Sequence, residues 1–254
     1  MSVNQPIFGL IGDGRLARHL ARYFQLLELP LRRWSRQSHQ QSHQHLGDDL
    51  FTSLQDCSTL LLAVSDRAIE PLANEIRSRP GFENRTLIHF SGSLFTEKAW
   101  GFHPLMTFPA LDSTETLYSL ERYEQIPFLI DQNGPSFSEV FPQLKNSSQR
   151  LDPEKKALYH AWCVMGGNFT AFLWTQMFEA FSKDLGIDPH LAIPYLKQVT
   201  ENLIQDPKAA RDTWTGPIVR KDIETIERHL SALSDHPYKE IYRAFLEAHG
   251  RTSS

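Results

Sequence analysis

Short apolar runs alternate with segments of helical periodicity over the first 130 residues. Most of the runs are continuous, which is typical of strands buried on both faces of a parallel sheet. Helical spacing at Arg15–Leu26 and Ile69–Arg79 separates the first of them. This alternation predicts an α/β, Rossmann-type doubly wound parallel sheet. Its predicted strands are Pro6–Ile11, Leu31–Trp34, Thr59–Val64, Thr86–Phe90, Trp100–His103 and Pro127–Ile130.

The pattern changes near residue 150, after which only helical periodicity remains. Three Asp-Pro pairs, at residues 152–153, 188–189 and 206–207, each resemble an N-cap followed by proline at the first helical position. The expected helices run from Pro153 towards Leu185, and over Pro189–Ile204, Val219–Leu233 and Pro237–Ala248. We therefore predict a dinucleotide-binding domain over residues 1–148 and an all-helical C-terminal domain over 149–254.

A glycine motif, Gly12-x-Gly14-x-x-Ala17, directly follows the first predicted strand and opens a helix. In a dinucleotide site the first glycine permits the turn, the second lets the backbone approach a pyrophosphate, and the helix N-terminus attracts the phosphates. The turn's other residues, Asp13, Arg15 and Leu16, are expected to contact the cofactor too. The carboxylate of Asp13 is unfavourable there, unless Arg15 offsets it or Asp13 caps the helix.

The end of the second predicted strand indicates which dinucleotide binds. An NAD site usually carries an acidic residue there for the ribose hydroxyls, whereas this chain has Ser35 and Arg36. A hydroxyl beside a guanidinium, with no carboxylate, suits a 2′-phosphate. The sequence therefore favours NADP.

Further polar residues stand at carboxyl ends of predicted strands, where open α/β sheets bind ligands. Val64 and Ser65 are expected along the cofactor. Ser91 is a candidate for cofactor contact and catalysis, Ser93 for substrate binding, and His103 for donating a proton to a reduced substrate.

Several motifs together resemble the superfamily of β-hydroxyacid dehydrogenases, ketopantoate reductases and deazaflavin-dependent NADP oxidoreductases. More specifically, the chain resembles a bacterial group in it that joins a Rossmann-like NADP-binding domain to a helical domain of unknown function. The motifs are the glycine turn, Val64-Ser65-Asp66-x-x-Ile69, His89-x-Ser91-Gly92-Ser93, Phe102-His103-Pro104-Leu105-x-x-Phe108, Tyr159-His160, Gly167-Asn168-Phe169, Thr215-Gly216-Pro217-x-x-Arg220-x-Asp222 and Glu227-x-His229-Leu230.

This resemblance implies a C-terminal domain similar to that of 6-phosphogluconate dehydrogenase, with the helix from Pro153 facing the nicotinamide. In the superfamily that helix supplies a lysine and, four residues later, an asparagine. Asn168 matches the asparagine, but Val164 stands at the lysine position. The nearest titratable group on that face is His160, about two turns earlier.

Two functions remain open at this point. The first is an NADP-dependent oxidoreductase acting on a small carbonyl, imine or hydroxy acid in the cleft between the two domains. Its catalytic candidates are His103, His160, Asn168 and Ser91, and Arg220 is a candidate for an anionic substrate group. The alternative is an NADP-binding sensor or interaction protein without dehydrogenase activity, which Val164 favours.

Composition limits the partners and the compartment. The 254 residues carry a formal net charge of −4 and lack a long apolar run, so neither nucleic acid nor a membrane is expected to bind. Two cysteines, Cys57 and Cys163, and no apparent signal peptide predict a cytoplasmic protein. The apolar helical domain suggests a homodimer. Residues 37–45 repeat Gln-Ser-His-Gln, and a metal site there is less expected than a solvated segment.

Overall fold

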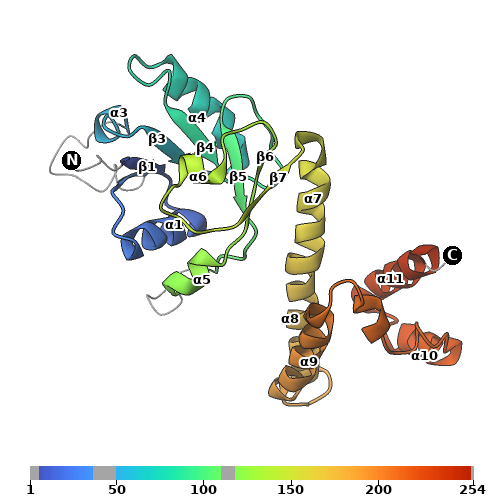
Figure 1. Ribbon diagram of the computed structural model, residues 1–254. Coiled ribbons are helices and arrows are strands. Elements are labelled where there is room, and N and C mark those ends of the chain that lie inside the picture. The colour runs from blue at the N-terminus through green and yellow to red at the C-terminus, as the bar shows by residue number, and fades with distance from the viewer. Residues whose placement is uncertain (1–5, 37–49, 110–117, 253–254) are drawn as a thin grey trace. The chain divides into compact units, whose positions relative to one another are not determined.

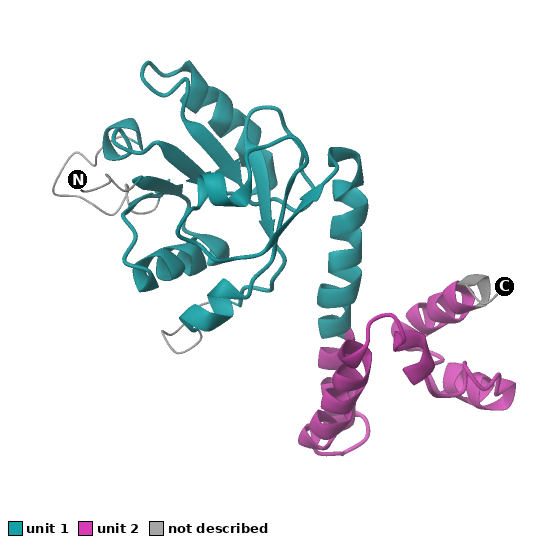
Figure 2. Ribbon diagram, in the orientation of Figure 1, with its two compact units in different colours: residues 1–172 teal, residues 173–254 magenta. Residues whose placement is uncertain are grey.

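The computed structural model describes residues 6–36, 50–109 and 118–252. It divides into two compact units, residues 1–172 and 173–254 (Figure 2), each of which is described by itself. The Gln-Ser-His-Gln segment lies outside the described residues. The predicted domain boundary between residues 148 and 149 falls within a strand, β7 (Ser148–Leu151), and stays a prediction.

One seven-stranded sheet organises the first unit (Figure 1), with the strand order β2-β1-β3-β4-β5-β6-β7. Neighbouring strands are parallel except for β5 and β6, which are antiparallel. The predicted doubly wound α/β fold is thus confirmed, with one antiparallel pair added. The other strands are β1 (Phe8–Ile11), β2 (Leu31–Trp34), β3 (Thr59–Leu62), β4 (Thr86–His89), β5 (Trp100–Pro104) and β6 (Phe128–Asp131).

Successive residues of the strands supply two separate cores. Leu61 and Ile88 point to the face covered by α1 (Arg15–Leu26), whereas Leu60, Leu62 and Leu87 point to the face covered by α4 (Asp66–Ser78). Short helices complete the two layers, with α5 (Leu120–Glu124) and α6 (Phe137–Val140) on the α1 face and α3 (Leu50–Ser53) on the α4 face. Burial on both faces explains why the strands are continuously apolar.

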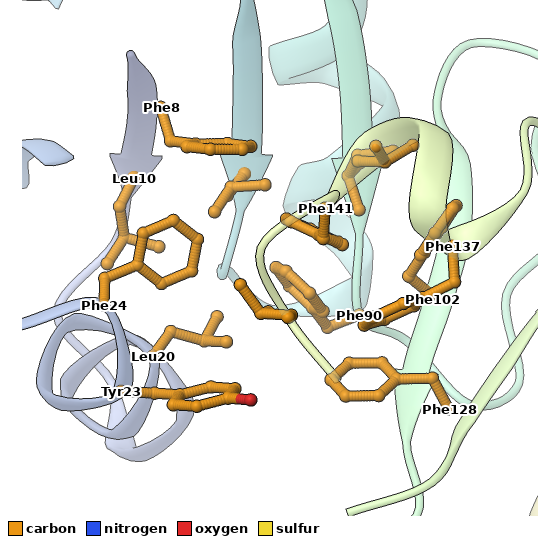
Figure 3. Close-up of a cluster of buried hydrophobic side chains, with 14 of the residues drawn as sticks. Phe8, Leu10, Leu20, Tyr23, Phe24, Phe90, Phe102, Phe128, Phe137 and Phe141 are labelled. Carbon is orange, nitrogen blue, oxygen red and sulfur yellow. The ribbon is translucent and has the colours of Figure 1, made fainter. Parts of the chain in front are cut away.

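Aromatic rings fill the core on the α1 face (Figure 3). The ring of Phe8 stacks on Phe141 with centroids 5.6 Å apart and meets the edge of Phe24 at 5.1 Å. Phe102, Phe128 and Phe137 extend this cluster across β5 and β6. The cluster joins α1 and α6 to the middle of the sheet.

Helical structure continues from Pro153 to Lys183, as predicted. A 3₁₀ turn (Pro153–Lys155) leads into α7 (Lys156–Cys163), a π-helical segment (Val164–Phe169) and α8 (Thr170–Lys183). Asp152 caps this start by accepting the Glu154 N–H at 2.9 Å. Gly166 and Gly167 lie in the π-helical segment, and an added Cβ at either meets no atom within 4 Å.

The second unit contains α9 (Ala192–Gln205), α10 (Ile223–Ala232) and α11 (Tyr238–Thr252). Two predictions about it were wrong. The third Asp-Pro pair opens no helix at once, because Asp206 ends α9 and accepts the Lys208 N–H in a turn. α10 begins four residues later than Val219, since Lys221 has a φ of +56° and Asp222 caps the helix. In the described part of the chain, no helix combines the length and the apolar character that crossing a bilayer requires.

Candidate functional site

A cleft of about 960 Å³ lies at the carboxyl ends of β1, β2 and β3. This volume is at the upper end of the range for small-molecule and cofactor sites. All residues that the sequence suggests for cofactor contact line it: Gly12, Asp13, Gly14, Arg15, Leu16, Ser35, Arg36, Val64, Ser65 and Ser91. The structure therefore brings these candidates together around one cleft, while their roles stay predictions.

The two glycines of the turn differ in what requires them. Gly12 has a φ of +128°, and a Cβ there would collide with the carbonyl oxygen of Ala63, so the fold itself needs this glycine. Gly14 has an ordinary backbone conformation, and a Cβ there would meet no atom within 4 Å. Gly14 is the N-cap of α1 and has no side chain that could accept a capping hydrogen bond. The first backbone N–H groups of the helix are therefore left for a ligand.

Asp13 does not cap α1, whose N-cap is Gly14, so that explanation was wrong, whereas an offset by Arg15 stays a prediction. The Asp13 carboxylate lies 3.4 Å from a guanidinium nitrogen of Arg33 and 3.5 Å from one of Arg18. Arg18 also donates to the Asp13 carbonyl oxygen at 3.2 Å. Two guanidinium groups around one carboxylate leave the turn with a local excess of positive charge, which suits phosphate groups.

A second group of polar side chains gathers over Gly92, just past the end of β4. Nδ1 of His103, on β5, lies 2.8 Å from the Tyr159 hydroxyl, on α7. The rings of His103 and His160 meet edge to face with centroids 5.7 Å apart. A Cβ on Gly92 would collide with Cδ2 of His160 and would lie 2.9 Å from Nε2 of His103. Gly92 therefore makes room for both imidazoles.

The protonation of this group follows from its surroundings. Burial, with the positive charges of His160 and Lys156 nearby, lowers the pKa of His103 to about 4. His103 is therefore neutral at pH 7. Burial also raises the pKa of the Tyr159 hydroxyl well above its ordinary value, and the Cys163 thiol adds to the increase. At neutral pH the pair is thus a phenol hydrogen-bonded to a neutral imidazole.

Ser91 connects this group with the cleft. Its hydroxyl donates to Oδ2 of Asp66 at 2.7 Å and accepts the N–H of Leu94 at 3.0 Å. Ser93 contacts the same carboxylate oxygen at 3.3 Å. Ser91 and Asp66 both line the cleft, and Ser91 directly precedes Gly92. The cleft and the histidine group are consequently neighbours at one edge of the sheet.

The residues of this region that were not among the sequence candidates include Asp66, Tyr159, Lys156 and Asp131. Tyr159 carried a signal, because it adjoins His160 in one of the quoted motifs. Lys156 and Asp131 form an ion pair of 2.7 Å under the histidine group, with side chains only 4% and 2% exposed. Nothing in the sequence distinguishes them from lysines and aspartates that face solvent.

The remaining candidates lie elsewhere. Asn168 is in the π-helical segment of the first unit, two turns beyond His160, with an exposed side chain. Val164 begins that segment. Arg220 belongs to the second unit, where the nearby Asp222 caps α10. The roles of Asn168 and Arg220 stay predictions.

Residues 131–248 match the model of the family described as "Domain of unknown function (DUF2520)". A structure from Bacteroides fragilis, whose assignment as an NADP oxidoreductase is itself an inference, superposes with a TM-score of 0.71 at 20% identity. This match covers 97% of this chain and 98% of that one. The chain has the Rossmann-type fold of these oxidoreductases, with a helical C-terminal region.

Structures of characterised enzymes share this fold at lower identity. A reductive aminase from Aspergillus terreus, in complex with NADPH and ethyl-5-oxohexanoate, has a TM-score of 0.65 at 12% identity, over 98% of this chain and 95% of that one. An imine reductase variant from Myxococcus stipitatus, in complex with NAD⁺, has a TM-score of 0.64 at 13% identity, over 98% and 94%. No curated protein matches the sequence.

Proposed function

We propose that the protein is an NADP(H)-dependent oxidoreductase that reduces a small carbonyl or imine compound. The observation that carries the proposal is that the cleft adjoins the group formed by His103, Tyr159 and His160, because Ser91 lines the cleft and the next residue, Gly92, makes room for both imidazoles. A cofactor cleft beside titratable groups at the carboxyl edge of a parallel sheet is the usual arrangement of a dehydrogenase site.

The residues of the cleft fit NADP. The space at Gly14 and the uncapped N-terminus of α1 suit a pyrophosphate, because backbone N–H groups and the helix dipole favour anions. Ser35 and Arg36, both on the cleft wall, would hold the 2′-phosphate. The NADPH-bound aminase of the same fold is in line with this assignment.

The bound cofactor would supply a hydride to the carbon of a C=O or C=N bond. The protein must then supply a proton to the oxygen or nitrogen of that bond. Tyr159 is the group we assign to this step, because its hydroxyl is protonated at neutral pH and contacts His103. With its proton on Nδ1, a neutral His103 donates to the Tyr159 oxygen and orients the phenol, which leaves the phenolic O–H to protonate the substrate. Ser93, His160 and Asn168 remain candidates for holding the substrate.

A second candidate function is cofactor binding without turnover, and Val164 favours it. The superfamily's lysine would be a strong acid–base group, which a valine cannot replace. A sensor of NADPH would need the cleft but not the contact between Tyr159 and His103. That contact, 2.8 Å long and half-buried, is the reason to prefer the enzyme.

Two measurements test the proposal. NADPH should raise the melting temperature and bind more tightly than NADH, since a ligand stabilises the folded state that binds it. A screen of ketones, keto acids and preformed imines should then find a compound that oxidises NADPH in the presence of the protein. Absence of NADPH binding at near-millimolar concentration rejects both candidate functions. Binding without turnover across the screen supports the sensor.

A further inference from the structure

Lys156 is buried although it is charged, with 3% of its surface exposed. The preceding residue, Lys155, is exposed. Nζ of Lys156 donates to Oδ1 of Asp131, the last residue of β6, at 2.7 Å. Burying a charged group costs desolvation free energy, which is offset only when the group forms a well-aligned ion pair. The position of Lys156 is therefore set by this contact.

Gly101 on β5 completes the arrangement. Its N–H donates to the other carboxylate oxygen of Asp131 at 2.5 Å. A Cβ on Gly101 would collide with Nζ of Lys156 and would lie 2.8 Å from Oδ1 of Asp131. The absence of a side chain at this strand position therefore lets the first turn of α7 rest directly on β5.

The ion pair lies next to both histidines at the ends of β4 and β5. His89 is paired with Gly101 in the parallel register and is fully buried. Its Nδ1 accepts the N–H of Ser91 at 3.2 Å, and Nε2 has no hydrogen-bond partner among the described residues. Burial lowers the pKa of both His89 and His103, and the nearby Lys156 charge lowers it further.

The spacing along α7 links the pair with the candidate site. His160 follows Lys156 by four residues, hence on the same helix face one turn later. Tyr159 and His160 are the two α7 residues that contact His103. The start of the helix is thus fixed at Gly101, and its next turn lies over Gly92, just past the end of β4.

We infer that Lys156 is a positioning residue: its ion pair with Asp131 seats α7 on β5, so that Tyr159 and His160 meet His103 over Gly92. The contribution of this placement to turnover rests on the proposed function. The placement itself rests only on the contacts of Lys156, Asp131 and Gly101, and is testable without a substrate.

The test compares Lys156→Met with Lys155→Met, an exposed lysine one residue earlier on the chain. Histidine NMR spectra recorded over a pH series report the pKa of His103 and its hydrogen bond to Tyr159. Besides His160, Tyr159 and Lys156 of α7, the titratable groups that act on His103 are Asp66 of α4 and His89 of β4. We expect Lys155→Met to match the wild type.

In Lys156→Met we expect the pKa of His103 to rise from its value of about 4, because one nearby positive charge has been removed while burial still keeps it low. The Tyr159 signature, meaning the effect of the Tyr159 hydrogen bond on the His103 spectrum, should weaken because the first turn of α7 is held less firmly. NADPH affinity should change less than about threefold, since Lys156 lies outside the cleft wall. With a substrate in hand, kcat should fall by about ten- to a hundredfold.

The double variant Lys156→Met/Asp131→Leu decides the matter if Lys156→Met does not fold, because an apolar pair of similar volume often replaces a buried ion pair without loss of stability. A folded variant in which the His103 titration and the Tyr159 signature are both those of the wild type overturns the inference. A wild-type protein that binds no NADPH overturns the proposed function instead, and leaves these histidine measurements interpretable.

Discussion

The Tyr159 hydroxyl lies 2.8 Å from Nδ1 of His103, so a phenol on α7 and an imidazole on β5 form one hydrogen-bonded unit. The two residues are far apart in sequence, and neither contact atom belongs to the cleft wall. Chemistry and cofactor binding are therefore separable by substitution.

Replacing Tyr159 by phenylalanine removes the hydroxyl and keeps the ring. We expect kcat to fall by about 10² or more, because a positioned proton donor contributes roughly that much to a reduction. NADPH affinity should stay within about twofold of the wild type. Stopped-flow NADPH oxidation and a binding titration give the two quantities. Tyr195→Phe, on α9 of the second unit, is the matched control and should leave both unchanged. An unaltered kcat in Tyr159→Phe would remove Tyr159 from the mechanism.

Gly92→Ala should disturb both histidines, since its Cβ would collide with Cδ2 of His160 and crowd Nε2 of His103. Overpacking of this kind costs about 1–3 kcal/mol of unfolding free energy. We expect that loss in urea denaturation. The same substitution in a His160→Ala background should cost less, because the missing imidazole leaves space. An equal loss of unfolding free energy in the two backgrounds would mean that the His160 imidazole does not pack against Gly92.

How far the sequence predicts this molecule depends on how each element is buried. The run at residues 59–64 and the amphipathic helix Arg15–Leu26 are found because burial dictates their residue types. Strand β7 was missed, since it is an edge strand of polar residues, Ser-Gln-Arg-Leu, paired only with β6. The pair of Lys156 and Asp131 was missed for a related reason, because its burial arises from long-range contacts that no local pattern records.

Gly14→Val tests whether the turn at Gly14 binds the cofactor or only connects β1 with α1. The backbone at Gly14 has a φ of −71°, which any residue adopts, and a Cβ there meets no atom within 4 Å. The melting temperature of the free protein should therefore stay within a few degrees of the wild type. NADPH affinity should fall by about tenfold or more, because the side chain occupies the space of the pyrophosphate. Calorimetry with and without NADPH measures both, and retained affinity would argue against this binding mode.

Gly12→Ala is the contrasting variant. Its φ of +128° and the collision with the Ala63 carbonyl predict a large loss of stability even without a ligand.

Arg36→Ala should weaken NADPH much more than NADH, since only NADPH carries the 2′-phosphate. Loss of a guanidinium–phosphate contact predicts about a ten- to hundredfold increase in the Kd for NADPH. Arg32→Ala, an exposed arginine on β2 outside the cleft wall, is the control and should change neither Kd by much. Fluorescence titration with each dinucleotide gives the ratio. An equal loss for NADPH and NADH would reject the assignment of Arg36.

Buried histidines make the stability of the protein depend on pH in a stated direction. Burial lowers the pKa of His89 and of His103 to about 4, and it lowers the pKa of His19 as well. The unfolded chain, with histidine pKa values near 6.5, therefore binds more protons than the folded protein between about pH 6.5 and 4. The contribution of these histidines to the free energy of unfolding is therefore complete above pH 6.5. It is lost as the pH falls through this range, by up to about 1.4 kcal/mol per pH unit for each histidine.

Urea denaturation between pH 7 and 5 isolates this effect. The carboxyl groups with lowered pKa values, those of Glu139, Asp188 and Asp222, withdraw their contribution only below about pH 4.5. His103→Gln should reduce the slope by about one proton, because glutamine does not titrate. A free energy of unfolding that stays constant from pH 7 to 5 would mean that these imidazoles are hydrated in the folded protein, and the neutral His103 on which the Tyr159 contact depends would have to be abandoned.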